Sequence, residues 1–319
     1  MKKIVVTGAT GFIGSNLIRK LIKDGHDVHL FVRPMFKQWR IADALSRVKI
    51  HVLDLESKES LEKALKRIKP QWLFHLATYG GYPSQKDLNK IIATNIIGTV
   101  NFMEAAVVTG FESFINIGSS SEYGFKDHPV KENEPLEPNS HYALSKAYMT
   151  MFARDLAVRN KLNIITLRPY SVYGAYEEPG RFIPTIIIKG LNGEWPPLVR
   201  PEIARDYIHV DDFIKACILA AKYKGKDRGL IFNAGCGKQI TIKEVVELAA
   251  ERFDIKIKPK WRTMPDRIWD TEIWVGNNNL IKDKLHWQCK TSFKNGFVKT
   301  LEWFRNNPDI RRFYEKEIR

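Results

Sequence analysis

The sequence predicts an α/β protein built on a doubly wound parallel sheet. Short apolar runs typical of buried strands alternate with helical-period patterns through the first half of the 319-residue chain, and this alternation is typical of parallel sheets covered by helices. The first strand passes directly into a glycine-rich turn and a helix, which is the local arrangement of a phosphate-binding turn. The length suffices for about two domains, so we expect a second, smaller unit beside the sheet.

The first strand and its turn occupy residues 3–14. Ile4, Val5 and Val6 form a β-branched run, which suits a strand buried on both faces. The glycines that follow at every third position permit a tight turn, close approach of the backbone to a pyrophosphate, and close packing of helix on strand. The N-terminus of the next helix then binds phosphates. The turn therefore predicts a dinucleotide site formed by Gly8, Thr10, Gly11, Phe12, Ile13 and Gly14.

The remaining elements follow in order. Strands are expected at 28–32, 48–53, 72–76, 114–117 and 164–167, with helices at about 57–69, 88–109 and 141–160. Sheets of this kind bind ligands at the carboxyl ends of their strands. We assign residues 1–168 to a dinucleotide-binding domain, with a returning segment near 205–235 that holds a helix at about 211–223 and a strand at 230–233. Residues 169–204 and 236–319 are assigned to a mostly C-terminal substrate-binding domain.

The composition limits the class of protein. Lys and Arg number 51 against 36 Asp and Glu, a net charge of +15, but the basic residues are spread along the chain among acidic neighbours. An anionic small molecule is therefore favoured over nucleic acid. No apolar stretch of about 18 residues occurs, so no membrane span is expected. The three cysteines show neither metal-ligand spacing nor a disulfide framework, so we expect no metal site and a reducing, cytoplasmic setting.

The end of the second strand bears on cofactor choice. NAD-selective sites usually carry an acidic residue there that binds the adenosine ribose, whereas this chain has Arg33, with Arg40 further on. A guanidinium suits a 2′-phosphate, so NADP(H) is favoured and NAD(H) stays possible; alternatively, Arg33 only ends a surface loop. Two more strand ends are expected at the cofactor, Asp54 and Leu55 near the adenine, and Leu76 and Ala77 near the nicotinamide.

The fifth strand leads into a serine run and then a helix, and together they indicate acid/base chemistry. Tyr142 and Lys146 are four residues apart on a helix that Asn139 or Ser140 caps, so they share a face. A free tyrosine has a pKa of about 10, and a nearby ammonium lowers it. Tyr142 is therefore a suitable acid/base for a substrate hydroxyl, and a serine of the run 119–121 can hydrogen-bond the same oxygen.

These features resemble the extended short-chain dehydrogenase/reductase family, in particular its nucleotide-sugar epimerases, dehydratases and reductases, whose core is a Rossmann-type sheet. The matching motifs cover most of the chain: Thr7–Gly14, Asp54–Leu55, His75–Ala77, Asn95 with Gly98–Thr99, the serines before Tyr123–Gly124, Tyr142 with Lys146, Leu167–Pro169 and Arg205–Asp212. The resemblance implies that Tyr142 is the acid/base, that Lys146 binds the nicotinamide ribose and tunes Tyr142, and that a serine assists. The catalytic serine can be assigned in two ways: an ungapped count back from Tyr123 selects Ser119, whereas alignment on Glu122 selects Ser120. Glu122 is also a candidate for a catalytic residue.

The resemblance also implies the substrate contacts. Two arginines, Arg205 and Arg267, are expected at a sugar-nucleotide diphosphate, which guanidinium groups bind bidentately, although either could instead form an interdomain ion pair. The complete substrate set is Ser119, Glu122, Tyr142, Ser171, Arg181, Arg205, Arg267 and Asp270, and Asn95 and Pro169 complete the cofactor set. The tryptophans at 261, 269, 274 and 287 are interpreted as core residues rather than base-stacking platforms.

The favoured function is reduction of a 4-keto-(6-deoxy)sugar nucleotide at C4 with NADPH. The alternative is a nucleotide-sugar 4-epimerase or 4,6-dehydratase, which oxidises C4 transiently and returns the hydride. Two observations favour the reductase. Relatives that retain their cofactor often carry an acidic residue after strand two, which is missing here. Dehydratases often carry an acidic pair after the catalytic serine or threonine, where this chain has only Glu122. A further alternative is an RNA-binding or cofactor-sensing protein, although a sensor would lack Tyr142 and Lys146. We also expect a homodimer formed through the helices at 88–109 and 141–160, which are apolar on more than one face.

Overall fold

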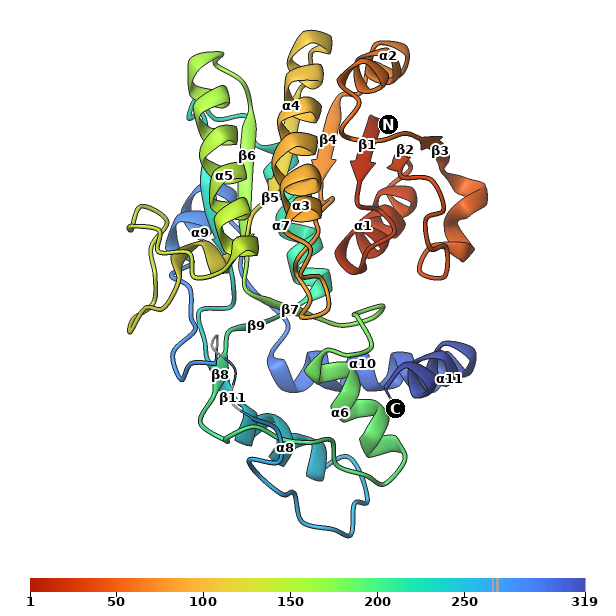
Figure 1. Ribbon diagram of the computed structural model, residues 1–319, viewed down its shortest axis with the longest axis vertical. Helices are drawn as coiled ribbons and strands as arrows, with labels where there is room; N and C mark the ends of the chain where they lie inside the picture. The colour runs from red at the N-terminus through yellow and green to blue at the C-terminus, as the bar shows by residue number, and fades with distance from the viewer. Residues whose placement is uncertain (266, 268–269, 319) are drawn as a thin grey trace.

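The computed structural model describes residues 1–265, 267 and 270–318. Figure 1 shows a sheet flanked by helices, with a smaller unit built mostly from the C-terminal half below it. The N-terminus lies in the sheet unit and the C-terminus in the smaller one. The predicted fold class, a Rossmann-type doubly wound sheet with a second unit, is confirmed.

The main sheet has seven parallel strands in the order β10-β6-β5-β4-β1-β2-β3. Their bounds are β1 Lys3–Thr7, β2 Asp27–Val32, β3 Lys49–Val52, β4 Trp72–His75, β5 Ser113–Ile117, β6 Ile164–Pro169 and β10 Ile231–Ala234. The expected returning strand is β10, which pairs with β6. Strand order reverses between β1 and β4, so the crevice for a ligand opens above these two strands.

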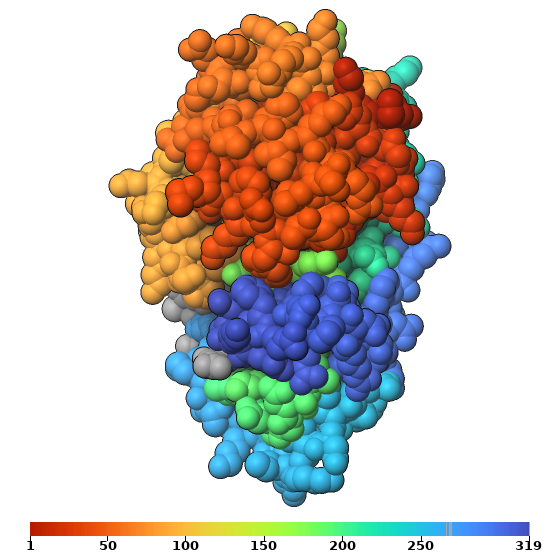
Figure 2. Space-filling model, turned by 90° about the vertical axis from the view of Figure 1, so that its right-hand side faces the viewer, coloured from red at the N-terminus to blue at the C-terminus, as the bar shows by residue number. Residues whose placement is uncertain are grey.

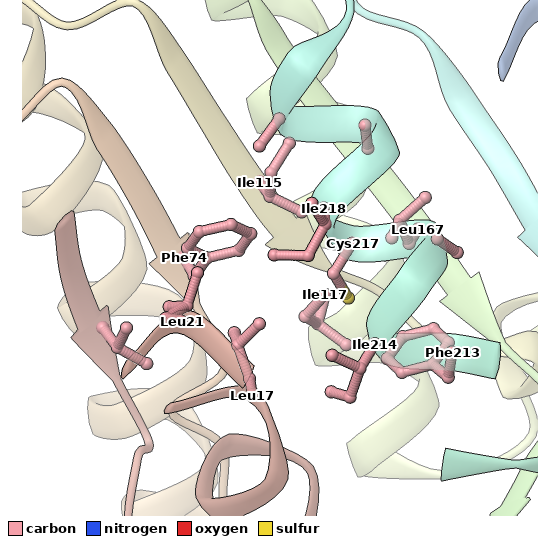
Figure 3. Packing of buried hydrophobic residues seen from close by; sticks show 14 of the residues in the cluster. Leu17, Leu21, Phe74, Ile115, Ile117, Leu167, Phe213, Ile214, Cys217 and Ile218 are labelled. Atoms are coloured by element: carbon pink, nitrogen blue, oxygen red, sulfur yellow. The ribbon is translucent and has the colours of Figure 1, made fainter. Parts of the chain in front are cut away.

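Helices cover both faces of this sheet. One face carries α1 (Phe12–Lys23), α7 (Val210–Lys222) and α9 (Asn279–Leu285), and the other carries α2 (Lys58–Ile68), α4 (Gly98–Thr109) and α5 (His141–Arg159). Alternation along β1 explains the two layers, because Ile4 and Val6 pack on the first face and Val5 on the second. Figure 3 shows the first face, where Leu17 and Leu21 lie across Phe74 from the apolar side chains of α7.

One predicted helix is interrupted. The expected helix at 88–109 consists of α3 (Leu88–Ile91), a π-helical segment η2 (Ile92–Ile97) and α4. By length and composition alone the segment Leu88–Thr109 could cross a membrane, although core helices of globular folds pass the same test. In this structure Phe102 and Met103 of α4 are fully buried in the layer under the sheet.

The second unit has its own core. It contains β7 (Ser171–Tyr173), β8 (Ala204–Arg205), β9 (Tyr207–His209), β11 (Ile240–Thr241), α6 (Phe182–Leu191), α8 (Ile242–Ala250), α10 (Phe293–Asn306) and α11 (Pro308–Glu317). Ile186, Val245 and Phe297 are buried at its centre. Figure 2 shows the C-terminal helices, in dark blue, lying between the N-terminal segments and the rest of the second unit. They therefore bridge the two units.

Two features depart from the sequence reading. The segment 279–287, assigned to the second unit, packs on the first core through Ile281, Leu285 and Trp287. Its return also brings Cys289 to Cys236, and the two form a disulfide across 53 residues. The sequence reading without a disulfide was wrong, because a pair separated so widely along the chain has no spacing signature. The third cysteine, Cys217, is free and buried.

Candidate functional site

The glycine turn after β1 can be built only from glycine at two positions. Gly8 has a φ of +68°, and a Cβ on it would lie 2.5 Å from the Ala77 amide nitrogen. A Cβ on Gly14 would lie 2.2 Å from the Gly8 carbonyl oxygen. Gly11 is the N-cap of α1 and carries no capping side chain, so the open amides of the first turn face the crevice. This cradle fits the pyrophosphate of a dinucleotide, with Thr10, Phe12 and Ile13 beside it.

A chain of buried polar groups holds the neighbouring strand ends together. The Thr7 hydroxyl oxygen lies 2.7 Å from His75 Nδ1, and His75 Nε2 lies 2.8 Å from the Thr99 hydroxyl. Burial, together with the charge of Lys146, lowers the pKa of His75 to about 3, so the imidazole is neutral. The amides of Leu76 and Ala77 donate to the Thr7 hydroxyl. These two residues are thereby fixed above the turn, where the nicotinamide end of the cofactor is expected.

Asn95, expected at the cofactor, joins two segments of the site through its carboxamide. Its side chain lies in the π-helical segment, fully buried. The carboxamide accepts from the Tyr79 amide and donates to the Tyr79 carbonyl, both at 2.8 Å. It also donates to the Ser145 hydroxyl of α5 at 2.8 Å. Asn95 therefore joins the loop after β4 to the helix that carries Tyr142. The wider π-helical turn places the Asn95 side chain between these two segments.

The adenosine end of the cofactor site has one available arginine. Arg33 is exposed directly after β2, as the sequence predicts. Arg40 is buried instead, and donates to the Tyr176 carbonyl at 2.8 Å and to Glu178 at 2.5 Å. The suggestion that Arg40 reaches a 2′-phosphate is therefore wrong. Asp54 is exposed after β3 and accepts from the Glu56 amide.

The predicted acid/base group is assembled at the end of β5. Ser140 caps α5 by accepting from the Ala143 amide, which sets Tyr142 and Lys146 on the face toward the sheet. Lys146 is buried, and its ammonium donates to the Ile117 carbonyl at 2.5 Å. The Ser119 hydroxyl donates to the Ser121 hydroxyl at 2.9 Å, and it lies close enough to Tyr142 to lower the pKa of the phenol. The ungapped alignment that selects Ser119 is thus consistent with this geometry.

The pKa of Tyr142 differs from the expectation. Burial raises it to about 12, while the Ser119 hydroxyl and the charge of Arg181 lower it and the charges of Glu122 and Tyr82 raise it. The Lys146 ammonium donates to the Ile117 carbonyl, and burial lowers the pKa of Lys146 itself to about 8. In the free protein Tyr142 is therefore a protonated donor, poised to give its proton to an oxygen.

Ser120 faces another partner. Its hydroxyl accepts from the indole nitrogen of Trp274 at 3.2 Å. The ring of Trp274 in turn lies 5.8 Å from the Arg205 guanidinium carbon. Trp274 therefore spans the distance between the serine run and the expected diphosphate arginine, and it is half-buried at the site rather than part of a core. Trp287 is a core residue as interpreted.

Glu122 is not a substrate group. It is completely buried, and one carboxylate oxygen accepts from the Ser119 amide at 2.7 Å and from the Thr150 hydroxyl at 2.9 Å. The other accepts from Arg168 Nε at 2.7 Å. Burial raises the pKa of Glu122 against the lowering effect of Arg168. Its expected catalytic and substrate-binding roles are corrected to a positioning role, because the completely buried carboxylate offers no surface to a ligand.

The expected diphosphate residues gather on the far side of Trp274. Arg205 is held by Asp270 at 3.3 Å and donates to the Ala204 carbonyl at 2.7 Å. Burial lowers the pKa of Arg205, and the charges of Arg181 and Arg267 lower it further, so both of these guanidinium groups lie within electrostatic range of Arg205. Asp270 also accepts from the Arg267 amide at 3.0 Å. Asp270, expected in the substrate set, is thus engaged with both arginines, and its neighbours 266, 268 and 269 in the sequence lie outside the described residues.

Space for a ligand continues past this cluster. An open groove of about 640 Å³ is lined by Phe125, Lys126, Asp127, Glu137, Arg200, Asp270, Thr271, Glu272 and Ile273. Ser171 lies half-buried in β7 and Pro169 ends β6, at the carboxyl edge of the sheet. Among the described residues no group of His, Cys, Asp or Glu side chains is arranged to hold a metal ion.

Three residues at the site escaped the sequence reading. Tyr82, after β4, is close enough to raise the pKa of Tyr142. Glu177 is buried beside Arg181. Asp206 accepts from the amides of Cys236, Gly237 and Gly276, and burial raises its pKa to about 6. Only Asp206 had a signal in the sequence, its position directly after Arg205.

Comparison with known proteins identifies the family. The sequence profile of the NAD dependent epimerase/dehydratase family matches residues 4–235, more than half of the chain. This chain belongs to that family. The family lies within the extended short-chain dehydrogenases/reductases, so the resemblance stated above is confirmed and the protein is an enzyme.

Relatives in this family span the whole chain. UDP-glucose 4-epimerase of Mycolicibacterium smegmatis is 28% identical over 317 residues, covering 95% of this chain and 99% of the relative. dTDP-glucose 4,6-dehydratase of Streptomyces griseus is 27% identical over 315 residues, covering 95% and 94%. The crystal structure of UDP-glucose 4-epimerase with UDP-glucose from Thermotoga maritima superposes with a TM-score of 0.86 at 26% identity, covering 96% and 99%.

The corrected role of Glu122 predicts a large stability effect. Glu122→Ala leaves the Arg168 charge buried without its partner, and we expect a loss of about 3–5 kcal/mol in unfolding free energy. Glu104→Ala is the matched control, because its pair with Lys58 is exposed and should contribute under about 1 kcal/mol. Urea unfolding midpoints measure both. Equal, small effects of the two variants would contradict the assignment.

Proposed function

We propose that this enzyme is a nucleotide-sugar 4-epimerase, which oxidises C4 of the sugar and returns the hydride to the opposite face. The observation that carries the proposal is that Tyr142 and Ser119 lie close enough at the end of β5 for the serine to lower the pKa of the phenol, in a fold that also holds a dinucleotide cradle and an arginine cluster. Relatives named UDP-glucose 4-epimerase cover the whole chain and support it.

The proposed chemistry assigns one task to each residue. Bound NAD supplies an acceptor, and then a donor, for the hydride of C4. Ser119 hydrogen-bonds the C4 oxygen, and Tyr142 takes its proton during oxidation and gives it back during reduction. Lys146 is the cation on the same helix face that stabilises the phenolate when it forms. Because the free phenol has a pKa of about 12, this stabilisation must come from the assembled complex.

Glu122 argues against dehydration at C5 and C6. A 4,6-dehydratase needs an additional acid beside the sugar to expel the C6 hydroxyl. In this chain the single carboxylate after the serine run is buried, and both its oxygens are occupied by Ser119, Thr150 and Arg168. The epimerase needs only the tyrosine, so its requirements fit the side chains present.

The substrate class follows from charge. Arg181 and Arg267 lie within electrostatic range of Arg205, and the three form a cluster suited to the two negative charges of a nucleoside-diphosphate sugar. Trp274 contacts both Ser120 and Arg205, and its ring offers an apolar wall for the sugar. We therefore propose that the sugar lies along Trp274 and the diphosphate at the arginines.

A second candidate is the NADPH-dependent reduction of a 4-keto sugar nucleotide. The observation that favours it is Arg33, exposed where NAD-selective sites usually carry an acid. A reductase would use the same Tyr142 as proton donor, and its raised pKa suits donation to a ketone oxygen. NADP(H) preference belongs to this candidate, whereas the family is described as NAD dependent.

We also propose that the enzyme is a homodimer. Apolar side chains on η2 and α5 are exposed in the single chain, namely Ile92, Ile97, Leu144, Tyr148 and Met151, with exposed fractions of 39–53%. The helices that carry them lie side by side in Figure 1. Exposed apolar side chains grouped on neighbouring helices mark an interaction surface, and a second copy would cover it.

The function is tested with a panel of nucleotide sugars. UDP-glucose, dTDP-glucose and UDP-N-acetylglucosamine are each incubated with the enzyme and NAD, and the products are identified by NMR. We expect inversion at C4 for at least one of them, without net consumption of cofactor. Tyr142→Phe should reduce turnover about 10²–10⁴-fold and leave cofactor affinity unchanged. Formation of a 4-keto-6-deoxy sugar would contradict the epimerase proposal.

The two serines give a second test. Ser119→Ala removes the hydroxyl that lowers the pKa of Tyr142, whereas Ser120→Ala removes one that is bonded to Trp274. We expect the first change to lower kcat more than the second, and Ser120→Ala to act mainly on KM. A larger loss of kcat in Ser120→Ala would transfer the catalytic role to Ser120.

Cofactor affinity separates the two candidates. If Arg33 binds a 2′-phosphate, the wild type prefers NADP(H), and Arg33→Ala reduces that preference about tenfold, the usual size of one charge-assisted hydrogen bond. Lys37→Ala, an exposed cation on the same segment, is the control. Dissociation constants for both cofactors provide the measurement. Tighter binding of NAD by the wild type would remove the support for a reductase.

A further inference from the structure

The loop between β7 and α6, residues 174–181, joins the two units. Arg40 of the first unit donates to the Tyr176 carbonyl at 2.8 Å, and its ion pair with Glu178 fixes the same loop. From the other unit, the Tyr314 hydroxyl of α11 donates to the Glu177 carbonyl. The loop is therefore held from both sides, and the side chains it presents to the site have defined positions.

Glu177 is the buried carboxyl group of this loop. Its side chain is 6% exposed, and one carboxylate oxygen lies 3.8 Å from Arg181 Nε. The other oxygen, Oε2, has no hydrogen-bond partner among the described residues. Burial raises the pKa of Glu177 to about 8. An incompletely satisfied buried carboxyl is costly, and no step of the proposed chemistry uses it.

The groups that face Glu177 come from every neighbouring element. They are Arg181 and Glu178 on the same loop, Arg40 after β2, Tyr82 after β4, Tyr173 on β7, Tyr207 on β9 and Tyr314 on α11. Two are cations, and Arg40 is already bound to Glu178 at 2.5 Å. Arg181 is therefore the cation that balances the charge of Glu177.

Arg181 is shared between this carboxyl and the site. The charge of Arg181 lowers the pKa of Tyr142. It also contributes to the lowered pKa of Arg205. The same guanidinium thus lies between the catalytic tyrosine and the arginine expected at the diphosphate. An anionic ligand on Arg181 would place a second negative charge beside Glu177 in a poorly solvated position. Two anions at one such site cannot both stay ionised without a large penalty, so one of them gains a proton.

We propose that Glu177 must be protonated when a nucleoside-diphosphate sugar binds, taking up one proton from solvent wherever it is ionised in the free enzyme, and that the neutral carboxyl leaves Arg181 to pair with the diphosphate. The inference rests on the proposed function for the class of ligand, and it adds a positioning residue that acts through Arg181. No bond other than the O–H bond on Glu177 forms. The diphosphate of a nucleotide sugar is a diester that is fully ionised near neutral pH, so the proton goes to the protein.

The test measures affinity against pH. UDP-, dTDP-, CDP- and GDP-glucose are titrated into the enzyme, and the tightest binder is followed at pH 7 and pH 9. Proton uptake by a group with a free pKa of about 8 weakens binding about tenfold between these values. We expect this dependence in the wild type and in Glu178→Gln, the matched control whose carboxylate binds Arg40. Glu177→Gln should abolish most of it.

Calorimetry supplies a readout that needs no variant. Binding heats at pH 9 in two buffers of different ionisation enthalpy give the number of protons taken up, and we expect about one for the wild type. Binding with no proton uptake, or an equal pH dependence in wild type and Glu177→Gln, would overturn the inference and leave the proposed function standing. Failure of all four nucleotide sugars to bind would overturn both.

Discussion

The buried ion pair between Glu122 and Arg168 is the interaction on which the site depends. Both side chains are almost completely inaccessible and 2.7 Å apart, and Arg168 belongs to β6, which lies between β10 and β5 in the sheet. Glu122 also fixes the serine run and α5, because it accepts hydrogen bonds from the Ser119 amide and from the Thr150 hydroxyl of α5. The serine and the helix that carries Tyr142 and Lys146 are thereby held to the same strand. A buried pair of this kind contributes geometry more than net stability.

The same arrangement limits the chemistry. With Glu122 buried, the proposed chemistry at the sugar depends on Tyr142 and Ser119, and the pKa of Tyr142 is raised by burial. The free enzyme is therefore a poor base, and deprotonation of a sugar hydroxyl requires the charges of the complete complex. The loop that carries Arg181 and Glu177 also acts on the catalytic tyrosine. The charge of Arg181 lowers the pKa of Tyr142.

Local signals in the sequence were sufficient for the fold and for part of the site. The glycine turn and the Tyr142–Lys146 spacing are set by neighbours within a few residues, so their roles could be predicted. Glu122 and Arg40 were misassigned because their partners, Arg168 and Glu178, are distant in sequence, and only the packed structure shows that their side chains are buried against these partners. The Cys236–Cys289 disulfide and the hydrogen bond from the Trp274 indole to Ser120 likewise join residues that are distant in sequence. Only the path of the folded chain brings them together.

The central claim is that C4 of the sugar is oxidised and then reduced by the same hydride, with Tyr142 handling the proton. A nucleotide sugar that carries deuterium at C4 tests it directly. The account predicts that the product has the inverted configuration at C4 and retains the deuterium there, while the exchangeable proton on the C4 oxygen comes from solvent. Incorporation of solvent hydrogen on carbon C4, or inversion at another carbon, would contradict it.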